Sequence, residues 1–142
     1  MKRLSVNEEI CIACGLCRVF CRVAHSNSHD LVKSHKQEKT PARIRVESQG
    51  TVALAVACLH CEEPGCVSAC LTGALYKDKE TGLVKFIAEK CIGCWSCVAF
   101  CPYDAIIQDQ EGAVIVKCDL CPFLTVPACV SHCPNEALKL KE

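Results

Sequence analysis

Sixteen cysteines in four groups form the clearest chemical pattern in this sequence. The groups are Cys11, Cys14, Cys17 and Cys21; Cys58, Cys61, Cys66 and Cys70; Cys91, Cys94, Cys97 and Cys101; and Cys118, Cys121, Cys129 and Cys133. The first and third groups have the spacing C-x2-C-x2-C-x3-C, by which bacterial proteins ligate iron-sulfur clusters. The other two groups widen the middle gap but keep the opening C-x2-C and the closing x3-C.

This spacing favours iron-sulfur clusters over zinc and over disulfides. Three cysteines on a tight loop can ligate three irons of one cluster, and the fourth lies on the following helix and points at another cluster. Structural zinc uses two C-x2-C pairs and has no place for a third nearby cysteine. Disulfide frameworks belong to oxidising compartments, and residues 1–8 lack the apolar stretch of a secretory signal, so we expect a reduced, cytoplasmic protein.

The composition excludes several other classes of function. The formal net charge is zero, without the basic excess of nucleic-acid-binding proteins. The longest apolar run, residues 52–59, is far shorter than the ~20 residues that span a bilayer, so we expect no membrane span. Sixteen thiolates and four oxidised cluster cores would together give the loaded protein a charge of about −8. The length fits a single compact domain, or two very small ones that share a core, and leaves no room for a separate substrate-binding domain.

The cysteine groups must be positioned by short local elements that repeat every ~30 to 45 residues, each unit holding a cysteine loop, a short helix and a β-hairpin. Alternating apolar segments predict hairpins that pair residues 74–77 with 83–87 and residues 105–107 with 113–116. Further strands are predicted at 43–47 and 135–140, and the polar segment 22–39 is predicted to be a loop or short helix. Gly15, Gly65 and Gly93 would let the loops adopt unusual dihedral angles.

In this order, the four motifs resemble those of the four-cluster iron-sulfur subunits of the dimethyl sulfoxide reductase and formate dehydrogenase type, together with the CooF-type subunit of carbon monoxide dehydrogenase systems. The strongest local matches lie at 58–66, 91–95 and 117–122. The resemblance implies an α+β fold with two interlocked bacterial-ferredoxin-like units, built from short helices and β-hairpins within a single polyferredoxin chain. The outer unit would combine 1–35 with 108–142, and the inner unit would be 52–107.

The same resemblance implies a crossed assignment of the ligands to four [4Fe-4S] clusters. The implied sets are Cys11, Cys14, Cys17 with Cys133; Cys118, Cys121, Cys129 with Cys21; Cys58, Cys61, Cys66 with Cys101; and Cys91, Cys94, Cys97 with Cys70. In some relatives a tryptophan replaces a cysteine of the third motif and leaves a three-iron cluster. Here Trp95 lies beside Cys94 and all four cysteines remain, so we expect no three-iron cluster.

The five histidines allow two interpretations each. His60 and His132 precede predicted ligand cysteines, so each could donate a hydrogen bond to a cluster sulfur or lie in an exposed loop. His25, His29 and His35 are loosely spaced and show no evident acidic partner, which disfavours a metal site and favours a loop that contacts a partner protein.

Four basic residues lie near the cysteine loops: Arg18, Arg22, Lys90 and Lys117. If they lie close to clusters, their charges would raise the reduction potentials, because a reduced cluster is more negative. The alternative is that they are solvated surface charges.

These patterns together predict an electron-transfer iron-sulfur subunit that is not itself an enzyme. By resemblance, the site of Cys11 would face a catalytic redox subunit, and the site of the third motif would face an onward acceptor such as a flavoprotein or hydrogenase. The compact length and the stretch 25–29 favour nickel carbon monoxide dehydrogenase, an anaerobic enzyme, as the catalytic partner. A molybdenum or tungsten pterin oxidoreductase, such as formate dehydrogenase or aldehyde oxidoreductase, is the alternative partner.

A free soluble polyferredoxin is a second class of function that the sequence leaves open. An iron-sulfur sensor is a third, but no DNA-binding helix is evident to support it. The short stretch after Cys133 leads us to expect a soluble complex rather than one that contacts a membrane subunit.

Overall fold

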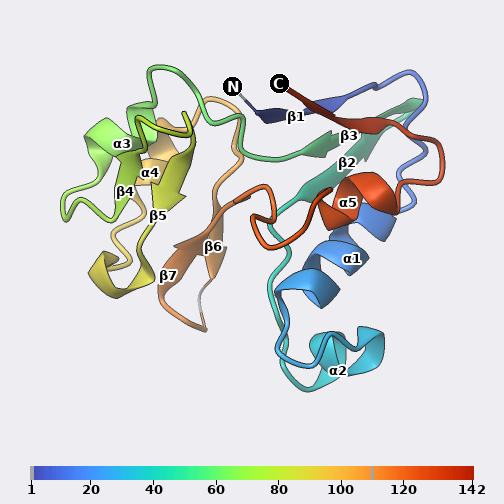
Figure 1. The fold of residues 1–142 in the computed structure, drawn as a ribbon, viewed down its shortest axis with the longest axis horizontal. Helices are drawn as coiled ribbons and strands as arrows, with labels where there is room; N and C mark the ends of the chain where they lie inside the picture. The colour runs from blue at the N-terminus through green and yellow to red at the C-terminus, as the bar shows by residue number, and fades with distance from the viewer. Residues whose placement is uncertain (1, 110) are drawn as a thin grey trace.

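Short helices and short paired strands alternate along the chain, as a computed structural model that describes residues 2–109 and 111–142 shows (Figure 1). The helices are α1 (Leu16–His25), α2 (Leu31–Lys36), α3 (Gly65–Ala69), α4 (Ser96–Phe100) and α5 (Ala128–Ser131), with a 3-10 turn η1 (Ala88–Lys90). The strands are β1 (Arg3–Val6), β2 (Arg45–Gln49), β3 (Val52–Val56), β4 (Leu75–Lys77), β5 (Val84–Phe86), β6 (Ile107–Asp109), β7 (Val114–Val116) and β8 (Leu138–Lys141). The predicted mixture of helices and strands is therefore confirmed.

In the part of the chain that the structure describes, the eight strands form four two-stranded antiparallel sheets, which are β1-β8, β2-β3, β4-β5 and β6-β7. The β1-β8 sheet pairs the two ends of the chain, with Leu4 opposite Leu140, and Figure 1 shows the N- and C-termini next to each other. In the same view, α3, α4 and β4 to β7 lie on one side, and β1 to β3, β8, α1 and α5 lie on the other.

The two predicted hairpins are present. In β4-β5 the side chains alternate, so Leu75 and Val84 are buried whereas Tyr76 and Lys85 are exposed, as expected for a sheet with one face on a core. In β6-β7 the first strand begins two residues later than predicted, because Ile106 turns into the core before the pairing starts at residue 107.

Three features of the strands were not predicted. Strand β1 and strand β3, the partner of β2, both lie outside the segments that were predicted to be strands, although β3 falls within the apolar run 52–59. The last strand begins at Leu138 rather than at residue 135. One contact and one backbone angle explain this late start: the Asn135 side-chain amide donates to the Ile10 carbonyl (2.9 Å), and Glu136 adopts a φ of 53°, which is incompatible with an extended strand.

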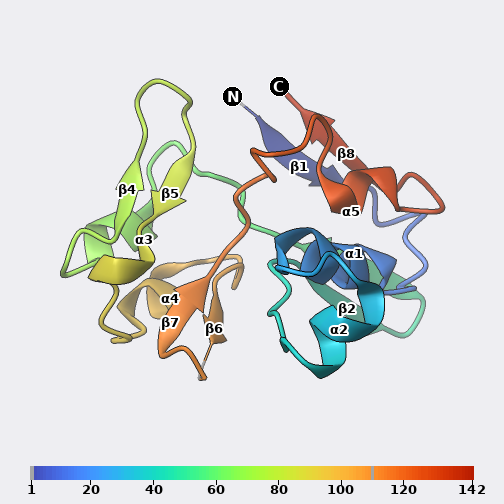
Figure 2. The same cartoon turned by 60° about the horizontal axis from the view of Figure 1, so that its bottom comes forward.

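The polar segment 22–39 contains the end of α1, a short loop and α2, so the predicted short helix is present. Asp30 caps α2, since its carboxylate accepts hydrogen bonds from the backbone N–H groups of Val32 and Lys33, both at 2.9 Å. Figure 2 shows α2 beside α1, on the side of the molecule away from β4 and β5.

Two buried cores correspond to the two sides of the molecule. One core gathers Leu4, Cys17, Cys21, Ile44, Ala55, Ala57, Cys58, Cys118, Leu120, Cys129 and Leu138. The other gathers Leu75, Val84, Cys97, Ile106 and Ile115. Strand β3 therefore packs with residues of the predicted outer unit, and β7 packs with residues of the predicted inner unit. Cysteines make up much of the first core, as expected for a small chain that relies on metal links.

Candidate iron-sulfur sites

Each closing x3-C places two cysteines on one helix or at its end. Residues four apart lie on the same face of a helix, about one turn from each other. Helix α1 carries Cys17 and Cys21 in this way, and Cys129 of α5 is followed by Cys133 just beyond the helix. Helices α3 and α4 show the same arrangement, with Cys70 and Cys101 at their C-caps. A single helix can therefore serve two neighbouring sites.

Three cavities are each lined by four cysteines, of which three come from one motif and one from another. The lining cysteines are Cys11, Cys14, Cys17 and Cys133 in the first cavity, Cys58, Cys61, Cys66 and Cys101 in the second, and Cys91, Cys94, Cys97 and Cys70 in the third. We call these the Cys11 set, the Cys58 set and the Cys91 set. The resemblance implies the same three groupings, and the role of these cysteines as cluster ligands stays a prediction.

The remaining four cysteines, the Cys118 set, are Cys118, Cys121, Cys129 and Cys21. All four are buried. They lie close enough that Cys118, Cys21 and Cys121 all add to the effect of burial in raising the pKa of Cys129. Helix α1 packs against α5, which brings the fourth cysteine of the first motif to the loop of the last motif.

Backbone N–H groups point at the cysteine sulfurs in a repeated pattern. In the two motifs whose last cysteine is followed by proline, the amide four residues on donates to the sulfur of that cysteine, from Ala105 to Cys101 at 3.4 Å and from Ala137 to Cys133 at 3.3 Å. The proline after each of these cysteines has a restricted φ, which helps hold this turn. Because N–H groups that donate to a sulfur favour its thiolate form, these amides are suited to cluster ligands.

Amides inside the motifs supply further donors to sulfur. His60 donates to Cys58 and Leu120 to Cys118, each through its backbone N–H at 3.4 Å. Arg43, from the segment before β2, donates its N–H to the sulfur of Cys21 at 3.2 Å. The sulfur of the fourth cysteine of the first motif thus accepts a hydrogen bond from an amide in a distant part of the chain.

The donor chemistry of these sets fits [4Fe-4S] clusters. Burial raises the pKa of Cys17 and of Cys97 to about 11, and that of Cys118 to about 12. Without a nearby positive charge these thiols would stay protonated at neutral pH. Iron supplies such a charge, and four thiolates per set are the ligands that a [4Fe-4S] cluster requires.

The sets differ in their access to solvent. Cys14 and Cys94 are exposed, and each lies beside an exposed isoleucine of its loop, Ile12 at 60% and Ile92 at 65% exposure. No cysteine of the Cys58 set or the Cys118 set is exposed. The Cys11 and Cys91 sets are therefore the two that contain an exposed cysteine, although Cys61, Cys66 and Cys101 of the Cys58 set are partly exposed.

The histidines near the loops lie in positions that the sequence did not reveal. His25 does have an acidic partner, contrary to expectation: its Nε2 lies 3.0 Å from Asp119, which also accepts a bond from Arg43 at 2.8 Å. Burial is the largest influence on the pKa of His25 and lowers it, but the hydrogen bonds to Asp119 and to Cys21 together outweigh burial, and the net pKa rises to about 9. His25, Asp119 and Cys121 together could hold a metal ion, although Cys121 is also a predicted cluster ligand.

The remaining histidines differ among themselves. His60 is fully buried rather than in an exposed loop, and its Nδ1 accepts a hydrogen bond from the Val84 N–H at 3.0 Å. His132 is exposed and stacks on Phe20, with ring centroids 3.7 Å apart. His29 is exposed, and the Nδ1 of half-buried His35 lies 2.9 Å from the carbonyl oxygen of Leu31 in its own helix.

The fold and the four cysteine sets define an iron-sulfur protein of the ferredoxin type, suited to multiple [4Fe-4S] clusters. Residues 50–142 match the family model of the 4Fe-4S dicluster domain, and residues 8–24 match a 4Fe-4S binding domain. The chain belongs to the 4Fe-4S dicluster family.

Relatives of this family are named for electron transfer. The chain is 36% identical over 138 residues to the thiosulfate reductase electron transfer subunit PhsB of Salmonella typhi, which covers 94% of this chain and 71% of that protein. It is 35% identical over 144 residues to the electron transport protein HydN of Escherichia coli K12, covering 90% and 81%.

A solved structure shares the fold. A chain of the active site complex BamBC of benzoyl coenzyme A reductase superposes with a TM-score of 0.54 at 20% identity, over 99% of this chain and 76% of that chain. Among the described residues, no helix is both long enough and apolar enough to cross a membrane.

Proposed function

We propose that this protein carries electrons through four [4Fe-4S] clusters as a subunit of a redox complex, and that it converts no substrate itself. The observation that carries the proposal is the sharing of helices between cysteine sets. Helices α1 and α5 each contribute to both the Cys11 set and the Cys118 set, while α3 and α4 each contribute to both the Cys58 set and the Cys91 set. Sites that share a helix lie next to each other.

The proposed order of sites is the Cys11 set, the Cys118 set, the Cys58 set and the Cys91 set. Cys58 and Cys118 belong to one buried core, which supports the middle step of this order. Exposure of Cys14 and Cys94 supports the assignment of the first and last sites as the entry and exit. A bound cluster supplies one-electron storage with little change in geometry. The protein contributes thiolate ligands, N–H donors and apolar side chains that exclude water.

The two interlocked units predicted from the sequence remain part of this proposal. The pairing of β1 with β8 and the packing of α1 on α5 support an outer unit made from both ends of the chain. Packing of α3 on α4 supports an inner unit. The core memberships suggest different boundaries, with β3 in the outer unit and β7 in the inner unit.

For the catalytic partner we keep nickel carbon monoxide dehydrogenase as the candidate, with a flavoprotein or hydrogenase as acceptor. The alternative is a molybdenum or tungsten pterin oxidoreductase. PhsB is named as the electron transfer subunit of a thiosulfate reductase, so a relative of this chain is named for an oxidoreductase other than carbon monoxide dehydrogenase. The cytoplasmic location stays a prediction from the sequence.

Metal analysis tests the number of clusters. Anaerobic purification should yield about sixteen iron and sixteen sulfide per chain, because each [4Fe-4S] cluster holds four of each. A value near half of this would refute four clusters.

Two substitutions near α5 test the crossed ligand sets against each other. Cys133→Ser should disturb the EPR signal of the Cys11 set, whereas Cys129→Ser should disturb that of the Cys118 set. The two cysteines are one helical turn apart, so local damage to α5 would be similar in both variants. If both variants disturbed the same cluster, the crossed assignment would be wrong.

Anaerobic co-purification tests the subunit role and the partner. We expect a larger redox enzyme to co-purify, and its content of nickel, molybdenum or tungsten would distinguish the two candidate partners. A protein that eluted alone at 15.5 kDa with full redox activity would favour a free polyferredoxin instead.

A further inference from the structure

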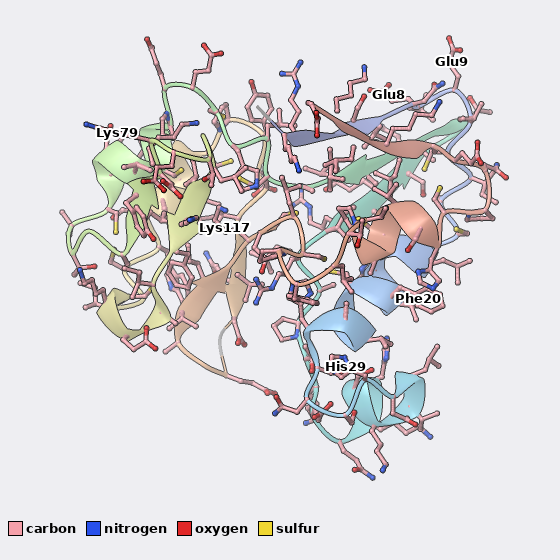
Figure 3. All side chains as sticks on the ribbon, in the orientation of Figure 1. Glu8, Glu9, Phe20, His29, Lys79 and Lys117 are labelled. Carbon is pink, nitrogen blue, oxygen red and sulfur yellow. The ribbon has the colours of Figure 1, made fainter. Side chains whose placement is uncertain are left out.

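Lys117 lies between the two sides of the molecule, where Figure 3 labels it near the centre. The sequence left open whether its side chain is a solvated surface charge. In the structure the side chain is buried, with 4% exposure. The Nζ atom donates to the carbonyl oxygen of Val84 at 2.6 Å and to that of Cys118 at 2.9 Å. The lysine therefore ties β5 on one side to the fourth cysteine motif on the other.

Val84 connects this lysine to the second motif as well. While the Val84 carbonyl accepts from Lys117, its N–H donates to Nδ1 of His60, which stands between Cys58 and Cys61 in the sequence. One residue of β5 is thus held by both the second and the fourth motif. The junction between the Cys58 set and the Cys118 set is built around these contacts.

Within residues 2–109 and 111–142, no acidic side chain forms an ion pair with the buried ammonium of Lys117. The nearby Asp119 is already bonded to His25 and Arg43. A buried cation is costly unless a negative charge compensates it. The negatively charged groups that this junction is built to hold are the cysteine thiolates and their clusters.

The ammonium of Lys117 lies close to both sets. Its Nζ bonds the carbonyl oxygen of Cys118 directly, and Val84, whose carbonyl it also bonds, lines the cavity of the Cys58 set. A cation placed in this way favours the extra negative charge of a reduced cluster on each side of the junction, most strongly where water is excluded.

We propose that Lys117 is a tuning residue shared by the two middle sites, whose buried charge raises the reduction potentials of the Cys58 and Cys118 clusters relative to those of the two end clusters. The proposal rests on the proposed function, since it requires that these sets hold clusters. Its consequence is that an electron entering at either exposed end meets two middle sites that accept it more readily than they would without the lysine.

Three variants of the full-length, cluster-loaded protein test this role. Lys117→Met removes the charge and the donor, Lys117→Gln removes the charge but keeps a donor for the carbonyls, and Lys117→Arg keeps both. Lys79→Met is the control, because Lys79 is exposed in the turn between β4 and β5 and its loss changes the net charge equally (Figure 3). The measurement is an EPR-monitored redox titration, with iron content determined for each variant.

We expect both neutral variants to lower two of the four potentials. At a fixed applied potential, the reduced-to-oxidised ratio of these two clusters should fall by about tenfold, which corresponds to about 59 mV for a one-electron couple. The arginine variant and the Lys79 control should keep all four potentials near those of the wild type.

Several results would overturn the proposal. Unchanged potentials in the neutral variants, an equal shift of all four clusters, or an arginine variant that behaves like the methionine variant would each exclude a shared tuning charge. If both neutral variants lost iron, Lys117 would be a structural residue and not a tuning one. Failure of the proposed function is distinguishable, because it would appear as too few clusters in the wild-type protein.

Discussion

Gly93 offers a sharp test of how the loop of the third cysteine motif is supported. Its φ is +70°, and a Cβ added there would lie 2.5 Å from the carbonyl oxygen of Ala113, just before β7. Gly15, in the first motif, has a similar φ of +77°, but an added Cβ would have no atom within 4 Å. The two glycines therefore share a backbone requirement and differ in one contact.

The expected costs follow from this difference. An alanine in the left-handed region costs about 1 to 2 kcal/mol at either position. Only Gly93→Ala adds a clash, because the loop and the hairpin must separate by roughly 0.9 Å to reach an ordinary contact, and such overpacking costs about 1 to 3 kcal/mol. We expect Gly93→Ala to be more destabilising than Gly15→Ala by that second amount.

The measurement is iron and sulfide per chain together with the rate of loss of visible absorbance on anaerobic heating. Gly15→Ala should retain nearly all of its iron, whereas Gly93→Ala should lose the cluster of the Cys91 set first, because that loop must move away from β7. Equal losses in the two variants would show that the left-handed backbone alone matters, and would refute the role assigned to the Ala113 contact.

Three further predictions concern the cores and the clusters. Leu75→Ala should destabilise the protein by about 2 to 5 kcal/mol, since Leu75 is 2% exposed, whereas Tyr76→Ala, at the next and exposed position, should cost far less in the same anaerobic melt. Phe20→Ala removes the stack on His132 and should cost about 1 kcal/mol, with faster iron release from the Cys11 set as the readout. Removal of the clusters by a chelator under oxidation should abolish the far-UV circular dichroism of the helices in the same step, because the first core contains cysteines that we propose as iron ligands; a native spectrum without iron would contradict this.

Much of the local structure could be predicted because short-range patterns encode it. The x3-C spacing implies two cysteines on one face of a helix, and α1 shows this with Cys17 and Cys21. Alternating apolar residues likewise predicted the β4-β5 hairpin, in which Leu75 and Val84 are buried. Both features depend on residues that are close in sequence.

Contacts between distant residues were the part that could not be predicted. His25 and Asp119 are 94 positions apart, so the acidic partner of this histidine was not evident. Strand β1 is only four residues long and carries little pattern of its own, and its pairing with β8 depends on where the other end of the chain arrives. The burial of Lys117 likewise depends on where β5 lies, and the residues of one cysteine motif cannot specify that position.

The sequence by itself determined the type of cofactor, since sixteen cysteines at these spacings leave little room for zinc or disulfides, and the loops that would bind it are formed by short-range sterics. Only the tertiary structure decided which cysteines are exposed, that His25 meets Asp119 and that Lys117 is buried. The physical reason is that loop geometry depends on dihedral angles within a few residues, whereas a shared site or a buried lysine depends on packing among segments from all parts of the chain.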